Sequence, residues 1–137
     1  MRSMKLWMSG EVDADVYDAF RAARQDVESA VAAVLAREAF GPPALEWAVI
    51  PIIRSEDHPD YRELVQFHAR RTTVEFRLRV SHVQFRSGTS GQQRGLLVQA
   101  LLRSLSMLPV GLSASVRAAE LGAGLSALAR SEGWPLT

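Results

Sequence analysis

Met4-Lys5-Leu6-Trp7-Met8-Ser9-Gly10-Glu11 determines how this chain begins to fold. Over residues 4–9 successive side chains fall on opposite sides, with Met4, Leu6 and Met8 together, so the pattern predicts a β-strand. Ser9-Gly10-Glu11 ends that strand in a predicted turn, and a helical pattern starts directly afterwards. A strand, a glycine turn and a helix in this order indicate a protein in which helices pack on a sheet.

Residues 14–40 have the pattern of one long amphipathic helix. Asp13 is suited to cap its N-terminus, Arg24 and Glu28 are spaced for an ion pair on the wet face, and Gly41 followed by proline ends it. Its apolar stripe consists of Val16, Phe20, Ala23, Val27, Val31 and Val34.

The middle of the chain predicts three further strands. Residues 45–53 form a nearly continuous apolar run, which favours a strand buried on both faces. Pro51 has no N–H to donate, so we expect an unpaired neighbour, a bulge or a strand end beside it. Residues 61–68 fit a strand or a helix; we favour a strand because residues 74–80 alternate clearly and residues 70–73 can join the two as a hairpin.

Two helices are predicted after the strands. Residues 87–91 form a loop in which Ser90 and Gln93 resemble a capping box, and the helix that follows runs to about Leu108. A final helix is predicted over residues 114–131. The apolar stripes are Leu97, Leu101, Leu105 and Leu108 in the first helix, and Val116, Leu121, Leu125 and Leu128 in the second.

The predicted fold class is therefore α+β, with a small mixed sheet of about four strands and three helices in the order β-α-β-β-β-α-α. The length of 137 residues predicts one domain over residues 1–137, with residues 1–3 as a disordered tail or preceding a natural start at Met4. Apolar residues make up 47% of the chain and charged residues 23%, which indicates a globular protein.

Composition excludes several classes of function. A net charge of +1 argues against nucleic acid or an anionic membrane as the main partner. The chain has no cysteine, so disulfides, thiolate nucleophiles and cysteine zinc sites are excluded, and a cytoplasmic location is favoured. No apolar stretch approaches the ~20 residues that a membrane span needs, so no membrane partner is expected.

No cofactor, metal or catalytic site is predicted from the motifs. His58, His68 and His82 are not spaced as ligand pairs. Residues 122–127 match G-x-G-x-x-A, but no predicted strand precedes them, so we interpret them as small residues in close helix packing. The best enzyme candidate is Ser9-Gly10-Glu11, whose donors can face a phosphate or ribose while Glu11 acts as acid or base.

Several stretches together resemble a family of bacterial proteins. They are residues 4–11, Phe20-Arg21 with Arg24 in the first helix, residues 47–53, Glu75-Phe76-Arg77-Leu78-Arg79-Val80, and Leu101-Leu102-Arg103-Ser104-Leu105. Over about residues 4–108 they are similar to immunity protein 44 of bacterial polymorphic toxin systems. The resemblance implies a small cytoplasmic protein, with no enzymatic activity, that binds and neutralises a cognate toxin domain.

Under this interpretation the toxin-binding face is predicted from residue type and strand pattern. Glu75, Arg77 and Arg79 alternate with apolar residues and so share one face of their strand, and Trp7 can lie on the same side of the sheet. Aromatic residues and Arg are the usual anchors of protein interfaces. The predicted anchors are Trp7, Arg77 and Arg79, followed by Glu75, Trp47 and Tyr61.

Two alternatives remain open. The first is a small nucleotide- or nucleoside-binding enzyme that uses Ser9, Gly10 and Glu11. The second is a packing scaffold or homodimer in which the apolar final helix pairs with a second copy of the chain.

Overall fold

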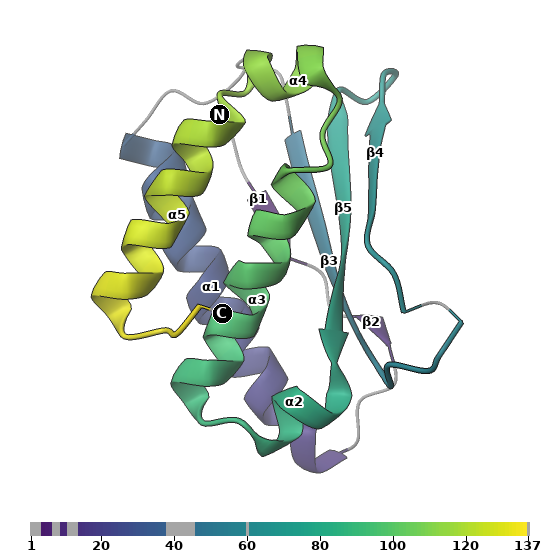
Figure 1. Ribbon diagram of the computed structural model, residues 1–137, viewed down its shortest axis with the longest axis vertical. Helices are drawn as coiled ribbons and strands as arrows, with labels where there is room; N and C mark the ends of the chain where they lie inside the picture. The colour runs from purple at the N-terminus through teal and green to yellow at the C-terminus, as the bar shows by residue number, and fades with distance from the viewer. Residues whose placement is uncertain (1–3, 7–8, 11–13, 38–45, 60, 137) are drawn as a thin grey trace.

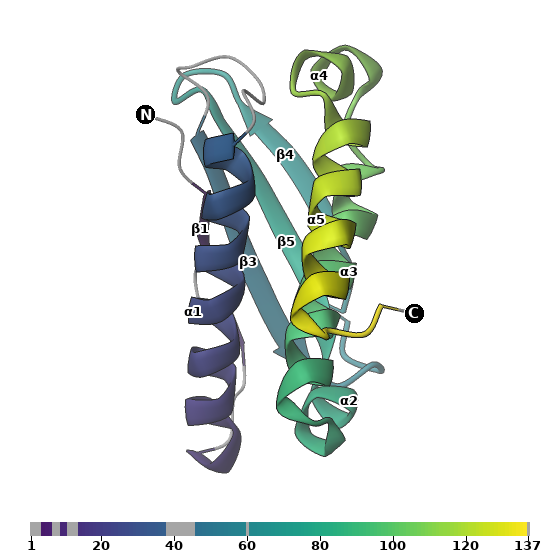
Figure 2. The ribbon, with the colours of Figure 1, turned by 90° about the vertical axis from the view of Figure 1, so that its left-hand side faces the viewer.

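The computed structural model describes residues 4–6, 9–10, 14–37, 46–59 and 61–136, and it places helices in front of a mixed β-sheet (Figure 1 and Figure 2). The strands are β1 (Met4–Leu6), β2 (Ser9–Gly10), β3 (Glu46–Arg54), β4 (Leu64–His68) and β5 (Thr73–Ser81). The helices are α1 (Ala14–Arg37), α2 (His82–Ser87), α3 (Ser90–Leu105), α4 (Val110–Ser115) and α5 (Ala118–Glu132).

The sheet is built around the parallel pair β3 and β5. β4 is antiparallel to β5 at one edge, and β1 and β2 both run parallel to β3 at the other. The chain thus passes from β3 to the edge strand β4 and returns through a hairpin to place β5 in the middle. Residues 69–72 form that hairpin turn, in which Thr72 takes a left-handed φ of 48°.

The α+β class and the mixed sheet are confirmed, but the predicted number of strands is corrected. Three longer strands, β3, β4 and β5, follow α1, and the longer elements run in the order α-β-β-β-α-α. Within the predicted strand over residues 4–9, Met4–Leu6 form β1 and Ser9 begins β2, both in the same register on β3, and residues 7–8 lie outside the described residues. Ser9 and Gly10 do not form the predicted turn: they extend the sheet, opposite Ile52 and Ile53. Glu11 lies outside the described residues.

Pro51 lies in the middle of β3. The described part of β1 pairs with Trp47–Val49 and β2 pairs with Ile52 and Ile53, both in the same register. Residues 7–8, between β1 and β2, lie outside the described residues, so the unpaired neighbour, bulge or strand end expected beside Pro51 stays a prediction on this side of β3. On the other side Pro51 lies opposite Leu78 in the continuous register of β3 and β5.

The hydrophobic core lies between the sheet and helices α1 and α3. Trp47 and Phe76 stack within it, with ring centroids 5.4 Å apart, and Phe20 of α1 meets Phe85 of α2 edge to face at 5.5 Å. β3 does not have the two equally buried faces that its apolar run predicts: Trp47, Val49, Pro51 and Ile53 are buried, whereas Ala48, Ile50 and Ile52 are half-buried. The apolar side chains on the second face are therefore available for contact.

Helix α5 forms a further layer, packed on α1 and α3 (Figure 1 and Figure 2). Leu121 and Leu125 are fully buried there, so the apolar stripe that the homodimer alternative requires is covered by this chain itself. A Cβ on Gly124 would lie 3.1 Å from Val34 of α1, and one on Gly122 would lie 3.7 Å from Leu102 of α3. The predicted role in close helix packing is confirmed for Gly124, whereas Gly122 leaves room for ordinary van der Waals contact.

The helices differ from the predictions in several places, and α3 ends at Leu105 and not at about Leu108. Residues 82–87, for which no element is predicted, form α2, and the predicted helix over residues 114–131 is divided into α4 and α5 at Arg117, whose φ is 56°. The capping box of α3 consists of Thr89 and Gln92, one residue earlier than predicted. Gln93 is instead buried, and its Nε2 donates a 2.9 Å hydrogen bond to the carbonyl of Phe85. The burial of the α3 leucine stripe and the end of α1 at a basic turn agree with the sequence pattern.

Within the described residues, no helix has the length and apolar character needed to cross a membrane.

Candidate functional site

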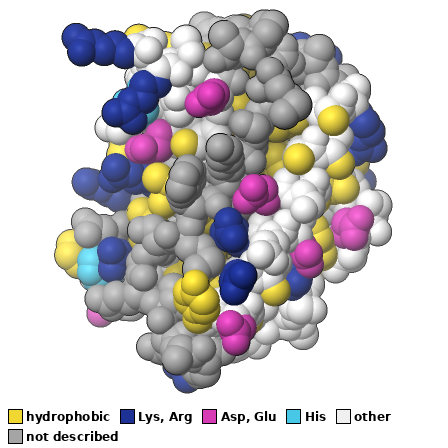
Figure 3. Space-filling view, turned by 180° about the vertical axis from the view of Figure 1, so that it is seen from behind, with side chains coloured by type: hydrophobic (Ala, Val, Ile, Leu, Met, Phe, Trp, Pro, Cys, Tyr) yellow, Lys and Arg dark blue, Asp and Glu magenta, His cyan; other side chains and the backbone are white. Residues whose placement is uncertain are grey.

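The side of the sheet away from the helices presents a mixed polar and apolar surface. Cross-strand register places side chains from β3, β4 and β5 together on it. Figure 3 views the molecule from this side and shows basic, acidic and hydrophobic side chains interspersed at its left. We call this surface the exposed sheet face; its described residues are Ala48, Ile50, Ile52, Leu64, Gln66, His68, Glu75, Arg77 and Arg79.

Charged side chains on the exposed sheet face hold one another in place. The Nε of Arg77 donates a 3.2 Å hydrogen bond to Glu75, and His68 approaches the other oxygen of the same carboxylate at 3.9 Å. The Arg77 side chain is nevertheless 47% exposed and that of Arg79 is 44% exposed. Both guanidinium groups are therefore oriented and still accessible to a partner.

Arg79 also borders a pocket at the end of β5. Its guanidinium carbon lies 5.5 Å from the centre of the Tyr61 ring, within the range of a cation–π contact. Its Nε lies 3.6 Å from Glu63 Oε1, and the Nε of Arg103 in α3 donates a 2.6 Å hydrogen bond to that same oxygen. One carboxylate, whose side chain is only 11% exposed, thus joins the sheet to a helix.

We call the space between these residues the Tyr61 pocket. It has a volume of about 380 Å³, which is within the range of small binding sites. Its lining combines two arginines with amide, hydroxyl, carboxylate and apolar groups: Glu56, Tyr61, Arg79, Val80, Ser81, Gln84, Leu96, Gln99 and Arg103. Burial raises the pKa of the Tyr61 phenol, and the carboxylate of Glu56 raises it further. Tyr61 is therefore a neutral hydrogen-bonding group at physiological pH.

Of the five predicted anchors that the structure describes, four lie close together and one does not. Glu75, Arg77 and Arg79 share the exposed sheet face, and Tyr61 is at its border beneath Arg79. Trp47 is corrected: it is 2% exposed and stacks on Phe76 in the core, so it cannot contact a partner of the folded protein. Trp7 lies outside the described residues and its place on this face stays a prediction.

Sequence reasoning missed Glu63, Arg103, Ile50 and Ile52. Arg103 occurs in a helix and Glu63 in a segment before a strand, 40 residues apart, so no spacing rule connects them. Ile50 and Ile52 belong to an unbroken apolar run, in which the sequence pattern does not show which face is exposed. Strand alternation nevertheless places both on the same side as Ala48.

The candidate histidines do not form a metal site within the described residues, and the predicted Ser9-Gly10-Glu11 site falls partly outside them. Among the described residues, no group of three or more His, Asp or Glu is placed to hold a metal ion.

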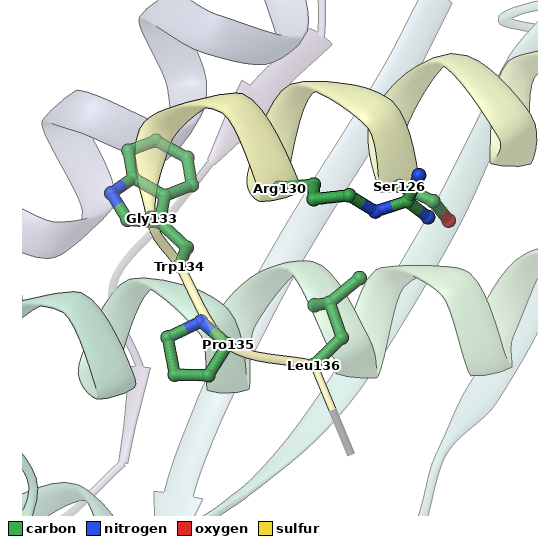
Figure 4. Close-up of a pocket in the computed structure, with 6 residues that line it drawn as sticks. All are labelled: Ser126, Arg130, Gly133, Trp134, Pro135 and Leu136. Atoms are coloured by element: carbon green, nitrogen blue, oxygen red, sulfur yellow. The ribbon is translucent and has the colours of Figure 1, made fainter.

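A cavity of about 520 Å³ lies between α5 and the segment that follows it. Figure 4 shows Ser126 and Arg130 on α5 with Leu136 pointing toward Arg130 from the opposite side. Trp134, on the same segment, is buried in the core.

The exposed sheet face and the Tyr61 pocket provide what a binding protein uses to hold another protein: oriented arginines, a tyrosine and half-buried aliphatic side chains. A comparison with models of known protein families matches residues 4–108 to immunity protein 44. Because this match covers most of the chain, the chain belongs to the immunity protein 44 family. No curated protein and no solved structure matches it.

Family membership establishes the general function. The chain is an immunity protein, which neutralises a cognate toxin by binding it and acts as an inhibitor and not as an enzyme. The resemblance seen in the sequence is thereby confirmed over residues 4–108, whereas α4, α5 and the segment after them lie beyond the matched region.

Proposed function

We propose that the chain neutralises its toxin through the exposed sheet face, with Arg77 and Arg79 at the centre of the contact and with Glu75 and Tyr61 beside them. The observation that carries this proposal is the pairing of Arg77 with Glu75 at 3.2 Å on a strand whose other side faces the core. A guanidinium that is already oriented loses less conformational freedom when a partner binds, so more of its interaction energy contributes to affinity.

Half-buried apolar side chains support the same surface. Ile50 lies opposite Arg77 in the β3–β5 register, and Ile52 lies opposite Arg79. Covering such aliphatic groups contributes ~25 cal/mol for each Å² removed from water, and the arginines supply orientation and specificity. A contact of ~1,600 Å² in total, the usual size for a stable complex, would cover this face and extend beyond it.

The partner is a protein: a cognate toxin domain of a bacterial polymorphic toxin system. We place the encounter in the cytoplasm, which suits a chain that has no cysteine. Trp7 is retained as a proposed contact. A net charge of only +1 gives no reason to expect the strong long-range attraction that a highly charged inhibitor would exert on its target.

We also propose that residues 1–137 form one domain, so that the region after residue 108 belongs to the same folding unit. Support comes from the burial of Val116, Leu121, Leu125 and Trp134, which share one cluster with side chains of α1 and β5. A part of the chain that supplies core residues contributes to the stability of the surface that binds the toxin.

Co-expression with the toxin domain encoded by the adjacent gene tests the binding face. Arg77→Ala should weaken the purified complex by ~30-fold in Kd, which corresponds to the ~2 kcal/mol typical of an interface anchor. Arg21→Ala is the matched control, because Arg21 is an exposed arginine on α1, in the helical layer. Loss of rescue and of affinity in the first variant alone supports the proposal. Unchanged affinity in both Arg77→Ala and Arg79→Ala rejects it.

A further inference from the structure

We infer that the Tyr61 pocket receives a carboxylate side chain, an Asp or Glu of the toxin, at the border of the contact. This inference rests on the proposed function and adds the chemistry of one partner group. Arg79 belongs both to the exposed sheet face and to the lining of the pocket, so a protein that contacts Arg79 on the face lies next to the pocket.

The two arginines of the pocket have donors to offer. Their closest contacts to Glu63 are both made by Nε, and both reach the same oxygen. The terminal Nη groups form the planar fork that suits a carboxylate, which has four lone-pair sites on two oxygen atoms. Because Arg79 comes from a strand and Arg103 from a helix, their forks approach the pocket from two elements.

Charge inside the pocket favours an anion. Two guanidinium groups face one half-buried carboxylate, Glu63, which leaves one positive charge uncompensated. Glu56 also lines the pocket but is itself exposed, so water screens it more strongly than Glu63. Glu56 therefore opposes an incoming carboxylate weakly, and its removal should improve binding.

Neutral groups in the lining complete the site. Gln84 and Gln99 carry amide N–H donors, and the raised pKa of Tyr61 keeps its phenol protonated and able to donate a hydrogen bond. A carboxylate accepts from all these groups. A lysine or arginine of the partner would instead meet two cations of its own sign, so the pocket discriminates against a basic side chain.

Charge-neutralising substitutions of the toxin test the inference, each measured against wild-type immunity protein and against Arg103→Gln. The toxin domain encoded by the adjacent gene is the probe. We expect one toxin Asp→Asn or Glu→Gln change to weaken the wild-type complex ~10-fold or more, which is at the lower end of the coupling measured for close charge pairs. That change should have little further effect in Arg103→Gln. If no toxin carboxylate shows coupling to Arg103, the inference is wrong.

Matched variants separate this result from a folding defect and from the proposed binding face. Arg94→Gln removes an arginine from the same helix. Arg94 does not line the pocket and pairs instead with Asp26 at a distance of 2.7 Å, so this variant should leave the affinity unchanged. Glu56→Gln should tighten the complex; a weakened complex would contradict the charge argument. If Arg77→Ala weakens binding and Arg103→Gln does not, the exposed sheet face is retained and the pocket is rejected. If Arg77→Ala and Arg79→Ala both leave the affinity unchanged, the proposed function is rejected, and the inference that rests on it is rejected with it.

Discussion

Arg103 of α3 donates a 2.6 Å hydrogen bond to Glu63, and this contact ties the helical layer to the segment that leads into the edge strand β4. The contact matters for the edge because β4 has only five residues and one neighbouring strand. The ion pair thus holds the border of the exposed sheet face in place. It also holds Arg79, which contacts the same oxygen of Glu63.

Glu63→Gln should destabilise the protein. The substitution keeps the size of the side chain but removes the half-buried negative charge that both arginines contact. Because the side chains of Arg79 and Arg103 are 44% and 37% exposed, solvent screens this loss to about 1 kcal/mol. Urea denaturation monitored by tryptophan fluorescence measures this as a lower midpoint with an unchanged slope. Glu56→Gln, at an exposed position of the same pocket, should leave the midpoint almost unchanged; equal effects of the two variants would contradict the role of Glu63.

Glu56→Gln should lower the pKa of Tyr61. Burial is the main cause that raises this pKa above its usual value of 10.0, and the negative charge of Glu56 is the second. Spectrophotometric titration of the phenolate in a Tyr17→Phe background isolates Tyr61, because the chain has two tyrosines. An unchanged or higher pKa would show that Glu56 does not act on the pocket.

The raised pKa of Tyr61 makes the free energy of unfolding depend on pH in the alkaline range. The folded state holds the phenolic proton of Tyr61 more tightly than the unfolded state, so its contribution is fully present below pH 10.0. The contribution is lost as pH rises from there through the pKa of the folded state. Tyr61→Phe, which has no proton to lose, should therefore show less alkaline loss of stability than the wild type above pH 10.

Ser55→Ala should raise the pKa of Asp57 toward 3.8. The hydrogen bond from the Ser55 hydroxyl is the main cause that lowers this pKa, and the backbone hydrogen bond of Asp57 is the second. The lowered pKa means that the bond favours the folded state above pH 3.8 and that this contribution disappears as pH falls further. Carboxyl chemical shifts followed by NMR across pH 2–6 measure the change; Glu56, in the same loop, serves as the internal comparison.

Gly95→Ala should detach the segment that follows α5. A Cβ at residue 95 would lie only 2.1 Å from the carbonyl oxygen of Pro135, so that segment must move away from α3 and take Trp134 with it. Partial loss of this burial costs ~1–3 kcal/mol. Gly111→Ala is the control, because nothing lies within 4 Å of its added methyl group and alanine favours a helix. The midpoint temperature of thermal unfolding should fall for Gly95→Ala and should stay the same or rise for Gly111→Ala.

Local patterns were sufficient to predict the long elements. Strict alternation identified β5 and with it the side of Glu75, Arg77 and Arg79, because strand period alone decides on which side a residue lies. Three- and four-residue spacing identified α1 in the same way. The capping box was misplaced by one residue because Ser90 and Thr89 both precede a glutamine at the required distance, and only burial of Gln93 distinguishes them.

Long-range contacts were not predictable from the sequence. Residue type alone predicts Trp47 as a surface anchor, because tryptophan is typical of interfaces, yet its stacking on Phe76 depends on the pairing of β3 with β5. The Tyr61 pocket requires a loop, a strand and a helix to meet, and a single sequence contains no signal for that meeting. A repeated apolar stripe likewise could not show whether α5 would pack on this chain or on another.

Hydroxyl-radical footprinting of the two tyrosines, in the free protein and in its complex with the toxin, most directly tests which face binds. Tyr61 borders the exposed sheet face, whereas Tyr17 is 44% exposed on α1 in the helical layer. The proposed function predicts that complex formation lowers the oxidation rate of Tyr61 severalfold and leaves that of Tyr17 unchanged. Protection of Tyr17 with undiminished oxidation of Tyr61 would place the toxin on the helices and contradict the proposed function.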